Sequence, residues 1–132
     1  MAVSHDGLDV SLEAAADLSS LQYCFVKLDT SGKAAAPGAN DRDTIGVLQN
    51  DDADAAGKAA VVRVNGTTKL IANEAINEGS FLTPVVTTGK AENVDAANEA
   101  ATAKAISAAT AQNDVISALI IPGGLPHATG TA

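Results

Sequence analysis

The sequence is divided into short apolar runs separated by glycine or small polar residues. "LDVSL", "LQYCFVKL", "TIGVLQ" and "AAVVRV" are rich in β-branched or aromatic residues and too short for typical helices. In the first run Leu8, Val10 and Leu12 alternate on one face, whereas "LQYCFVKL" is apolar on both faces, as in a central strand. This punctuation predicts an all-β fold built from short strands.

The chain has 132 residues, enough for one domain with a modest core. We therefore expect a small β-barrel or β-tulip-like domain with at most one short helix and extended termini. We divide it into an N-terminal arm and first strand (residues 1–20), a single β domain (residues 21–121) and a Pro/Gly-rich tail (residues 122–132). The apolar residues are largely alanine, and each buries little surface, so help from a partner subunit or surface is expected.

An Asn-Gly pair lies between two strand-like runs in "VVRVNGTTKLIA". Both residues tolerate positive φ, which a two-residue type I′ hairpin turn requires. The sequence therefore predicts a hairpin turn at Asn65 and Gly66.

The second half of the chain repeats a pattern of the first. "GVLQNDD" followed by "AAVVRV", and "ISAATAQND" followed by "VISALII", each read as a strand, an Asn-Asp bend and a β-branched strand. We expect two copies of one hairpin-like unit, with the later strands at residues 104–108 and 115–121. A further short strand is expected at residues 80–83, where Pro84 limits the ladder.

Alanine-rich residues 95–101 favour a short helix or helical turn, because alanine has the best helix propensity. The tail "PGGLPHATGTA" holds too much proline and glycine to pack and is expected to be extended or mobile.

The formal net charge is −8, with a sequence pI near 4.4. Such a chain is repelled by phosphates, so neither nucleic acid nor membrane is an expected partner. No apolar run is long enough to span a bilayer, and "MAVSHDGLDV" has no signal-peptide pattern, so we expect a protein made in the cytoplasm.

The loop "LQNDDADAAGK" is the strongest candidate for a metal site. Asn50, Asp52 and Asp54 match the first three ligand positions of an EF-hand-type loop. However, Ala55 stands where the turn needs glycine, and Val61 stands where the closing glutamate belongs. We expect a solvated connection between strands and no metal or other cofactor.

No constellation of catalytic residues is evident in the sequence. Ser4, His5 and Asp6 have the residue types of a hydrolase triad, but consecutive side chains diverge along an extended chain. His127 lies in the tail, and the single cysteine, Cys24, is expected to be a small buried residue. We therefore expect no enzymatic activity.

The turn "INEGSFL" is similar to turns in lipoyl- and biotinyl-carrier domains. These domains present a modified lysine at a hairpin tip, and the nearest candidate is Lys90 in "TTGKAE". The residues around Lys90 do not match the carrier pattern, so the similarity is one of turn chemistry.

Most of the chain is covered by three segments, "SHDGLDVSLEAAADLSSLQYCFVKL", "IGVLQNDDADAAGKAAVVRVNGTTKLIANEAINEGSFLTP" and "DVISALIIPG". These segments, most specifically "IGVLQND" and "GKAAVVRVNGTTKLIA", resemble the cement or decoration proteins of tailed bacteriophage and prophage capsids. Residues 92–103 depart from this resemblance as an enlarged loop. The resemblance implies a non-catalytic virion protein without a cofactor. It would bind the outside of a shell of major capsid protein, as a homo-oligomer, with a trimer favoured over a dimer.

The polar, alternating N-terminal segment is the candidate for attachment. We predict that residues 1–12 form an arm that adds to a strand edge on the shell or a neighbouring subunit. The open alternative is that Leu8, Val10 and Leu12 form an ordinary edge strand. A small-ligand or metal-binding module and a carrier domain modified at Lys90 also stay open. The candidate contact residues are His5, Asp6, Gly7, Leu8, Val10 and Leu12.

Overall fold

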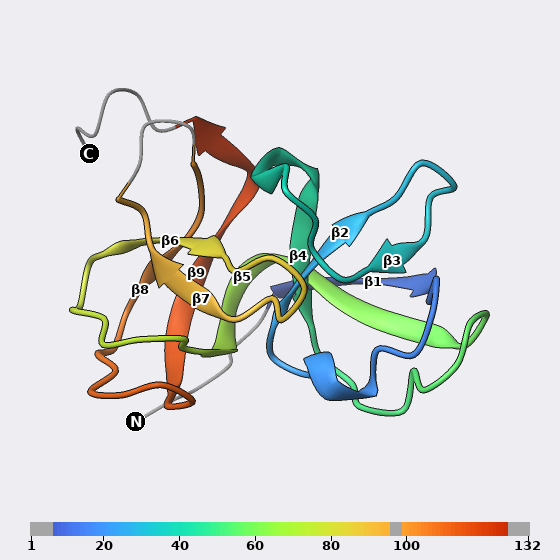
Figure 1. Ribbon diagram of the computed structural model, residues 1–132, viewed down its shortest axis with the longest axis horizontal. Helices are drawn as coiled ribbons and strands as arrows, with labels where there is room; N and C mark the ends of the chain where they lie inside the picture. Colours follow the sequence, from blue (N-terminus) through green and yellow to red (C-terminus); the bar gives the residue numbers. More distant parts are fainter. Residues whose placement is uncertain (1–6, 96–98, 127–132) are drawn as a thin grey trace.

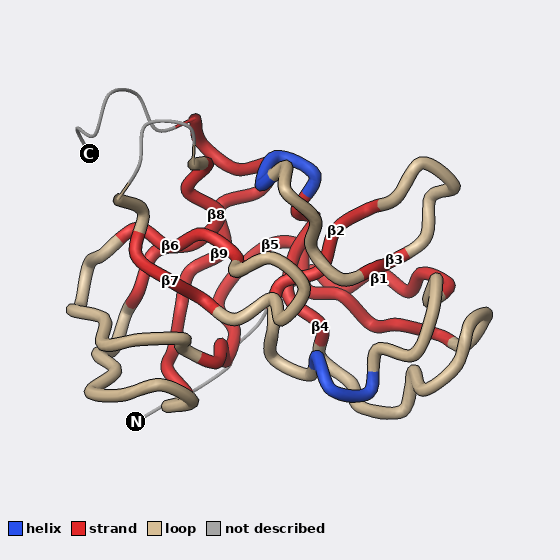
Figure 2. Tube along the Cα trace, in the orientation of Figure 1, coloured by secondary structure: helices blue, strands red, loops and turns tan. Residues whose placement is uncertain are grey.

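The computed structural model describes residues 7–95 and 99–126. These residues form one curled, open antiparallel sheet and two short 3-10 helices, so the expected all-β class is confirmed (Figure 1, Figure 2). None of their helices is long and apolar enough to cross a membrane. The elements are β1 (Gly7–Glu13), η1 (Ser19–Leu21), β2 (Phe25–Leu28), β3 (Ala34–Ala35), η2 (Asp41–Asp43), β4 (Thr44–Leu48), β5 (Ala59–Ile71), β6 (Phe81–Pro84), β7 (Ala91–Asn93), β8 (Ala100–Ala105) and β9 (Val115–Pro126).

The sheet consists of two halves with the same strand pairing, which we call the N-terminal half (residues 7–65) and the C-terminal half (residues 66–126). In the N-terminal half β1 pairs with the first part of β5, β5 with β4, β4 with β2 and β2 with β3. In the C-terminal half the second part of β5 pairs with β9, β9 with β8, β8 with β6 and β6 with β7. The two halves lie side by side with β5 running between them (Figure 1).

Individual residues of the two halves correspond as well. A parallel bridge joins Ala14 to Ala34 in one half and Ala72 to Ala91 in the other. The Leu18 N–H donates to the Ala53 carbonyl at 2.8 Å, and the Ile76 N–H donates to the Ala109 carbonyl at 2.9 Å. The expectation of a repeated hairpin unit is confirmed, since β4–β5 and β8–β9 are both antiparallel hairpins, and the repeat extends to all five strands of each half.

The predicted hairpin turn at Asn65 and Gly66 is wrong. Strand β5 runs through both residues, and Gly66 takes a positive φ of 94° inside the strand. The two flanking runs do not pair with each other, because the first finds β1 and β4 while the second finds β9. The Asn-Gly pair thus marks the crossing of one strand from the first half of the sheet to the second, and tertiary pairing overrides the local turn preference.

The alanine-rich segment forms a strand where a helix was predicted. Ala100 and Ala101 begin β8, so the predicted helix is wrong for these residues, while residues 96–98 lie outside the described part of the chain. Strand β8 therefore ends at Ala105, and the strand predicted at residues 104–108 was placed too late. Pairing with β9 decides the outcome, because propensity is a weak prior against tertiary context.

The C-terminal tail begins later than predicted. Residues 115–121 form a strand as expected, but β9 continues to Pro126, where Ala100 pairs with Pro126 and Ala101 with Leu125. The pairing of β8 with β9 shifts its register between Ala101 and Ala103. The rest of the tail, residues 127–132 including His127, lies outside the described residues.

Each half encloses its own hydrophobic core. The first core includes Leu18, Val26, Leu48 and Val62, and the second includes Leu70, Ile76, Leu82 and Ile116. Two large side chains of the N-terminal half, Phe25 on β2 and Val47 on β4, belong instead to the core of the C-terminal half.

Cys24 lies in the N-terminal core and is buried as expected. Burial raises the pKa of its thiol to about 11, and the positive charge of Lys90 opposes that rise. The thiol is therefore protonated, and hence weakly nucleophilic, at neutral pH.

Candidate functional site: an apolar groove in the N-terminal half

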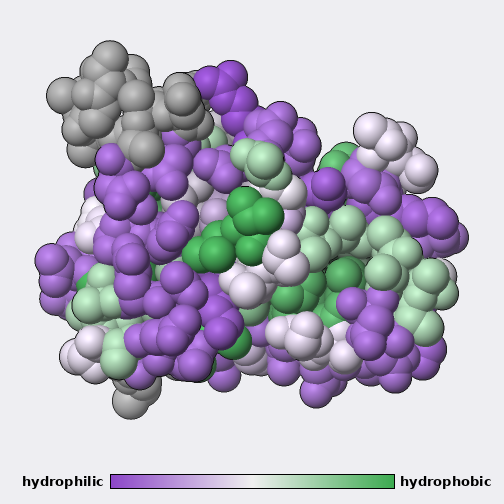
Figure 3. All heavy atoms as spheres, in the orientation of Figure 1, coloured by the Kyte–Doolittle hydropathy of each residue, from purple (hydrophilic) through white to green (hydrophobic). Residues whose placement is uncertain are grey.

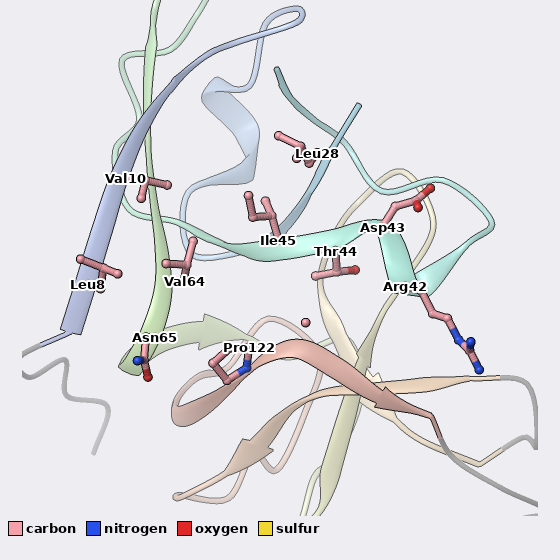
Figure 4. A pocket seen from close by; sticks show the side chains of 11 residues that line it. Leu8, Val10, Leu28, Arg42, Asp43, Thr44, Ile45, Val64, Asn65 and Pro122 are labelled. Carbon is pink, nitrogen blue, oxygen red and sulfur yellow. The ribbon is translucent and has the colours of Figure 1, made fainter. Parts of the chain in front are cut away.

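An apolar groove with a volume of about 590 Å³ opens on the N-terminal half. Side chains from β1, β2, β4 and β5 form its walls, and the bend of β9 forms one end (Figure 4). The lining residues are Leu8, Val10, Leu28, Arg42, Asp43, Thr44, Ile45, Val64, Asn65, Pro122 and Gly123.

The groove exists because β1 and β3 meet only at one end. Ala14, directly after β1, bridges to Ala34, and β1 has no other strand on that edge among the described residues. On β1 the side chains of Leu8 and Val10 face the groove, since alternate residues of a strand share one face. The groove is thus the uncovered mouth of the N-terminal core.

An ion pair on the outer side fixes β1 to β5. Arg63 Nε lies 2.7 Å from Asp9 Oδ1, and Arg63 Nη2 lies 3.2 Å from Asp9 Oδ2, which gives a two-point contact. This geometry is the more favourable form of a salt bridge on a partly buried surface. It holds the strand that carries Leu8 and Val10, and therefore one wall of the groove.

The corresponding mouth of the C-terminal half is covered. By strand register, Val10 corresponds to Thr68, Leu28 to Pro84, Ile45 to Thr102 and Val64 to Ile120. All four residues of the C-terminal half are buried, whereas Leu28 is 41% exposed and the other three of the N-terminal half are partly exposed. The two mouths have the same backbone plan and opposite solvent exposure.

Residues of the N-terminal half cover the corresponding mouth of the C-terminal core. The Phe25 N–H donates to the Gly89 carbonyl at 2.7 Å, and the Thr87 N–H donates to the Pro37 carbonyl at 2.9 Å. Gln49 Nε2 donates to Thr68 Oγ1 at 2.8 Å, so the N-terminal half also supplies a hydrogen bond to a buried hydroxyl of this mouth. Phe25 and Val47 complete the cover by packing into the second core.

The predicted contact residues fall into three groups. His5 and Asp6 lie outside the described residues. Gly7, Leu8, Val10 and Leu12 lie in β1, which is an edge strand paired with β5, so the edge-strand alternative is the one the structure shows for them. Leu8 and Val10 line the groove, and Leu12 packs partly against the N-terminal core.

The acidic loop is a polar connection between β4 and β5. Asn50 ties it together, since its side chain donates to the Ala59 carbonyl at 3.0 Å and accepts from the Val61 N–H at 2.9 Å. Asp54 lies 2.7 Å from the ammonium of Lys58, which raises the pKa of that lysine. Among the described residues no group of three or more His, Cys, Asp and Glu side chains is arranged to hold a metal ion.

Lys90 does not lie at a hairpin tip. It follows Gly89 at the end of the β6–β7 turn and is partly buried, while the exposed residues of that turn are Val86, Thr87 and Thr88. Its Nζ donates to Asn113 Oδ1 at 2.6 Å.

Sequence reasoning missed most of the groove. Leu28, Ile45 and Val64 were expected only as strand residues, because a strand pattern does not tell which apolar side chain stays uncovered. The signal that points to them is the repeat itself. "FVKLDTSGKAA" and "FLTPVVTTGKAE" place Leu28 against Pro84 once the two halves are aligned by their first phenylalanines, with a gap of one residue before the Gly-Lys-Ala segments.

Neither a scan against protein-family models nor a search of curated proteins found a match to this chain.

Proposed function

We propose that the protein is a non-catalytic capsid decoration protein, which binds the outer surface of an assembled phage shell and stabilises it. The proposal rests on the sequence resemblance of "IGVLQND" and "GKAAVVRVNGTTKLIA". The structural observation that supports it best is the uncovered mouth of the N-terminal core. A contact that buries Leu8, Leu28 and Val64 would stabilise the folded chain by mass action.

One face of the molecule carries a continuous area of apolar surface (Figure 3). It gathers over the junction of the halves and over the N-terminal half, within a polar surround (Figure 3). Exposed apolar patches rimmed by polar residues are typical of protein interaction surfaces. The alanine-rich cores offer little stabilising area of their own, so contacts made in an assembly count for more.

We place shell attachment at residues 1–6, which include His5 and Asp6 and lead into β1. Because β1 is an edge strand, a segment that precedes it can add to a strand of the shell without disturbing the pairing of β1 with β5. This placement replaces the longer arm of residues 1–12, since residues 7–12 are already paired within the sheet.

The test is co-sedimentation with expanded heads assembled from the cognate major capsid protein. We expect the full chain to bind to saturation and to raise the temperature at which the heads come apart. A chain lacking residues 1–6 should lose at least tenfold in affinity, while a control lacking residues 127–132 should bind as the full chain does.

The outcomes separate the function from the attachment segment. Absence of binding by the full chain would overturn the decoration proposal. Equal binding by the chain without residues 1–6 would keep that proposal and move the shell contact elsewhere on the molecule.

The size of the groove favours one alternative, a module that binds a small apolar ligand. Its volume of about 590 Å³ is within the usual range of ligand pockets. This function requires saturable one-to-one binding of an apolar probe such as anilinonaphthalene sulfonate, with loss of binding in Ile45→Glu. Calorimetry that shows no such binding would eliminate it.

A further inference from the structure

We infer that the groove of the N-terminal half receives the outer face of the C-terminal half of a second copy of this chain. Such a head-to-tail contact would repeat, between two molecules, the contact that already joins the two halves within one. This inference concerns the free protein and does not depend on binding to a shell.

The contact within the chain defines the donor surface. Phe25 on β2 and Val47 on β4 are register partners on the outer side of the N-terminal half, and both are fully buried in the C-terminal core. The corresponding partners in the C-terminal half are Phe81 on β6 and Lys104 on β8. Phe81 is only partly buried, and Lys104 is exposed with its ammonium 5.4 Å from the centre of the Phe81 ring.

The outer face of the C-terminal half also continues beyond this pair. Leu119 is the register partner of Lys104 on β9 and is 44% exposed. Phe81, Lys104 and Leu119 thus form a row across three strands, in the position where the N-terminal half presents Phe25 and Val47. The equivalent face of the N-terminal half covers the C-terminal core. Among the described residues, no further core lies against this face of the C-terminal half.

The acceptor surface is the groove and the turn beside it. In the C-terminal half Gly89 lies against Phe25, so close that an added Cβ would meet the Phe25 carbonyl oxygen. The corresponding residue of the N-terminal half is Gly32, which has a similar φ of 78° and, among the described residues, no atom within 4 Å of an added Cβ. Within the described part of the chain, the position that receives Phe25 in one half therefore has no occupant in the other.

The charges on the two surfaces are compatible with the inferred contact. Lys104 stands where the N-terminal half has Val47, so the donor face carries a cation. The groove rim near Leu28 carries the carboxylates of Asp29 and Asp43 together with the cations of Lys27 and Arg42. An ammonium placed beside the two carboxylates would gain favourable electrostatic interactions, which help to fix the register of the contact.

The inferred contact is heterologous, because two different surfaces of the chain meet. Repetition of such a contact gives a closed ring when the rotation permits and an open filament otherwise. Both surfaces remain available on each molecule, so a variant that lacks one of them keeps the other. This property provides the test.

The experiment uses two variants of the full chain with complementary defects. Leu28→Glu places a charge in the groove, and Phe81→Ser with Lys104→Glu alters the outer face. Ile106→Glu is the control, because Ile106 is 49% exposed and lies in the β8–β9 loop, outside both surfaces. Circular dichroism and cooperative melting establish folding, and Leu8→Glu, at a residue 58% exposed, replaces Leu28→Glu if that variant does not fold.

Light scattering after size-exclusion chromatography, over a series of concentrations, measures association. We expect the wild-type chain and Ile106→Glu to associate beyond one 13.1 kDa chain, and each defective variant alone to show at least a tenfold weaker association. An equal mixture of the two defective variants should form one-to-one pairs that do not grow further. Wild-type chains that stay monomeric, or a mixture that fails to pair, would overturn the inference whatever the result with phage heads.

Discussion

The two halves share one backbone plan but fill their interiors differently. At corresponding core positions the N-terminal half has Leu48 and Val62 where the C-terminal half has Ala105 and Ala118. Phe25 and Val47 of the N-terminal half belong to the same core cluster as these small residues, whereas at another corresponding position the larger residue is Ile116 of the C-terminal half, against Ala60. The N-terminal half fills its own core and leaves its mouth open, whereas the C-terminal half depends on its neighbour.

Position within the repeat, and not strand pattern, decides which residues are buried. Phe25 and Phe81 both lie at the start of a four-residue strand and have corresponding register partners, Val47 and Lys104. Phe25 is fully buried only because a second half follows it in the chain. The following predictions test this asymmetry.

The largest expected effect is at Phe25. Phe25→Ala removes a buried ring that the C-terminal core needs, and we expect the free energy of unfolding to fall by about 3–5 kcal/mol. Phe81→Ala at the corresponding, only partly buried position should cost about 1 kcal/mol. Urea denaturation of both variants measures the difference.

Phe25→Leu keeps the experiment informative if the alanine variant does not fold. It should unfold at a urea concentration between those of the wild type and Phe25→Ala. Equal losses of stability for Phe25→Ala and Phe81→Ala would contradict the claim that only one of the two faces is covered.

The next largest effect is the difference in stability between alanine substitutions at Gly89 and at Gly32. Both have positive φ, which costs an alanine about 1–2 kcal/mol. Only at Gly89 would the new Cβ also collide with backbone, the carbonyl of Phe25, so we expect Gly89→Ala to cost about 3 kcal/mol and Gly32→Ala about 1 kcal/mol.

Both glycine variants are best made together with Leu28→Glu, so that association does not contribute to the measured stability. Chemical denaturation then compares two backbone positions with similar φ and different surroundings. A loss for Gly32→Ala as large as that for Gly89→Ala would show that φ alone sets the cost and that the close approach to Phe25 is unimportant.

Much of the fold was predictable because local pattern and tertiary pairing agree. The alternation of Leu8, Val10 and Leu12 identified β1, and the apolar run around Phe25 identified an interior strand. The repeated strand, Asn-Asp bend and strand pattern identified both long hairpins. Strands β3 and β7, with two and three residues, were missed because they are too short to show periodicity.

The failures occurred where local preference and tertiary pairing disagree. Asn65 and Gly66 favour a tight turn, but each flanking run gains more from other strands, so the chain continues straight through. Ala100 and Ala101 favour a helix, but β9 extends far enough to pair with them. Of the candidate site, Leu8 and Val10 were predicted, while Leu28, Ile45 and Val64 were missed, because strand pattern alone does not show which apolar side chains a neighbouring element covers.

The smallest expected effect is a dependence of stability on alkaline pH that comes from one thiol of the N-terminal half, that of Cys24. Cys24 and Ser80 are corresponding residues, since the Leu48 N–H donates to the Cys24 carbonyl as the Ala105 N–H donates to that of Ser80. Burial raises the pKa of the Cys24 thiol from its ordinary 9.0 to about 11. Between these values the unfolded chain loses the proton before the folded chain does, so stability is complete below about pH 9 and falls as the pH rises toward 11.

The expected loss is about 2 kcal/mol, and Cys24→Ala should remove it because alanine has no proton to lose. The quantity to measure is the difference in the free energy of unfolding between the wild type and Cys24→Ala from pH 8 to pH 11 by urea denaturation, since lysine and tyrosine titrations common to both chains cancel in that difference. Ser80→Ala, made at the corresponding residue of the C-terminal half, is the matched control and should leave the slope of the wild type unchanged. Parallel curves for wild type and Cys24→Ala would mean that the thiol ionises as easily in the folded chain as in the unfolded chain. The N-terminal core around Cys24 would then be accessible to water.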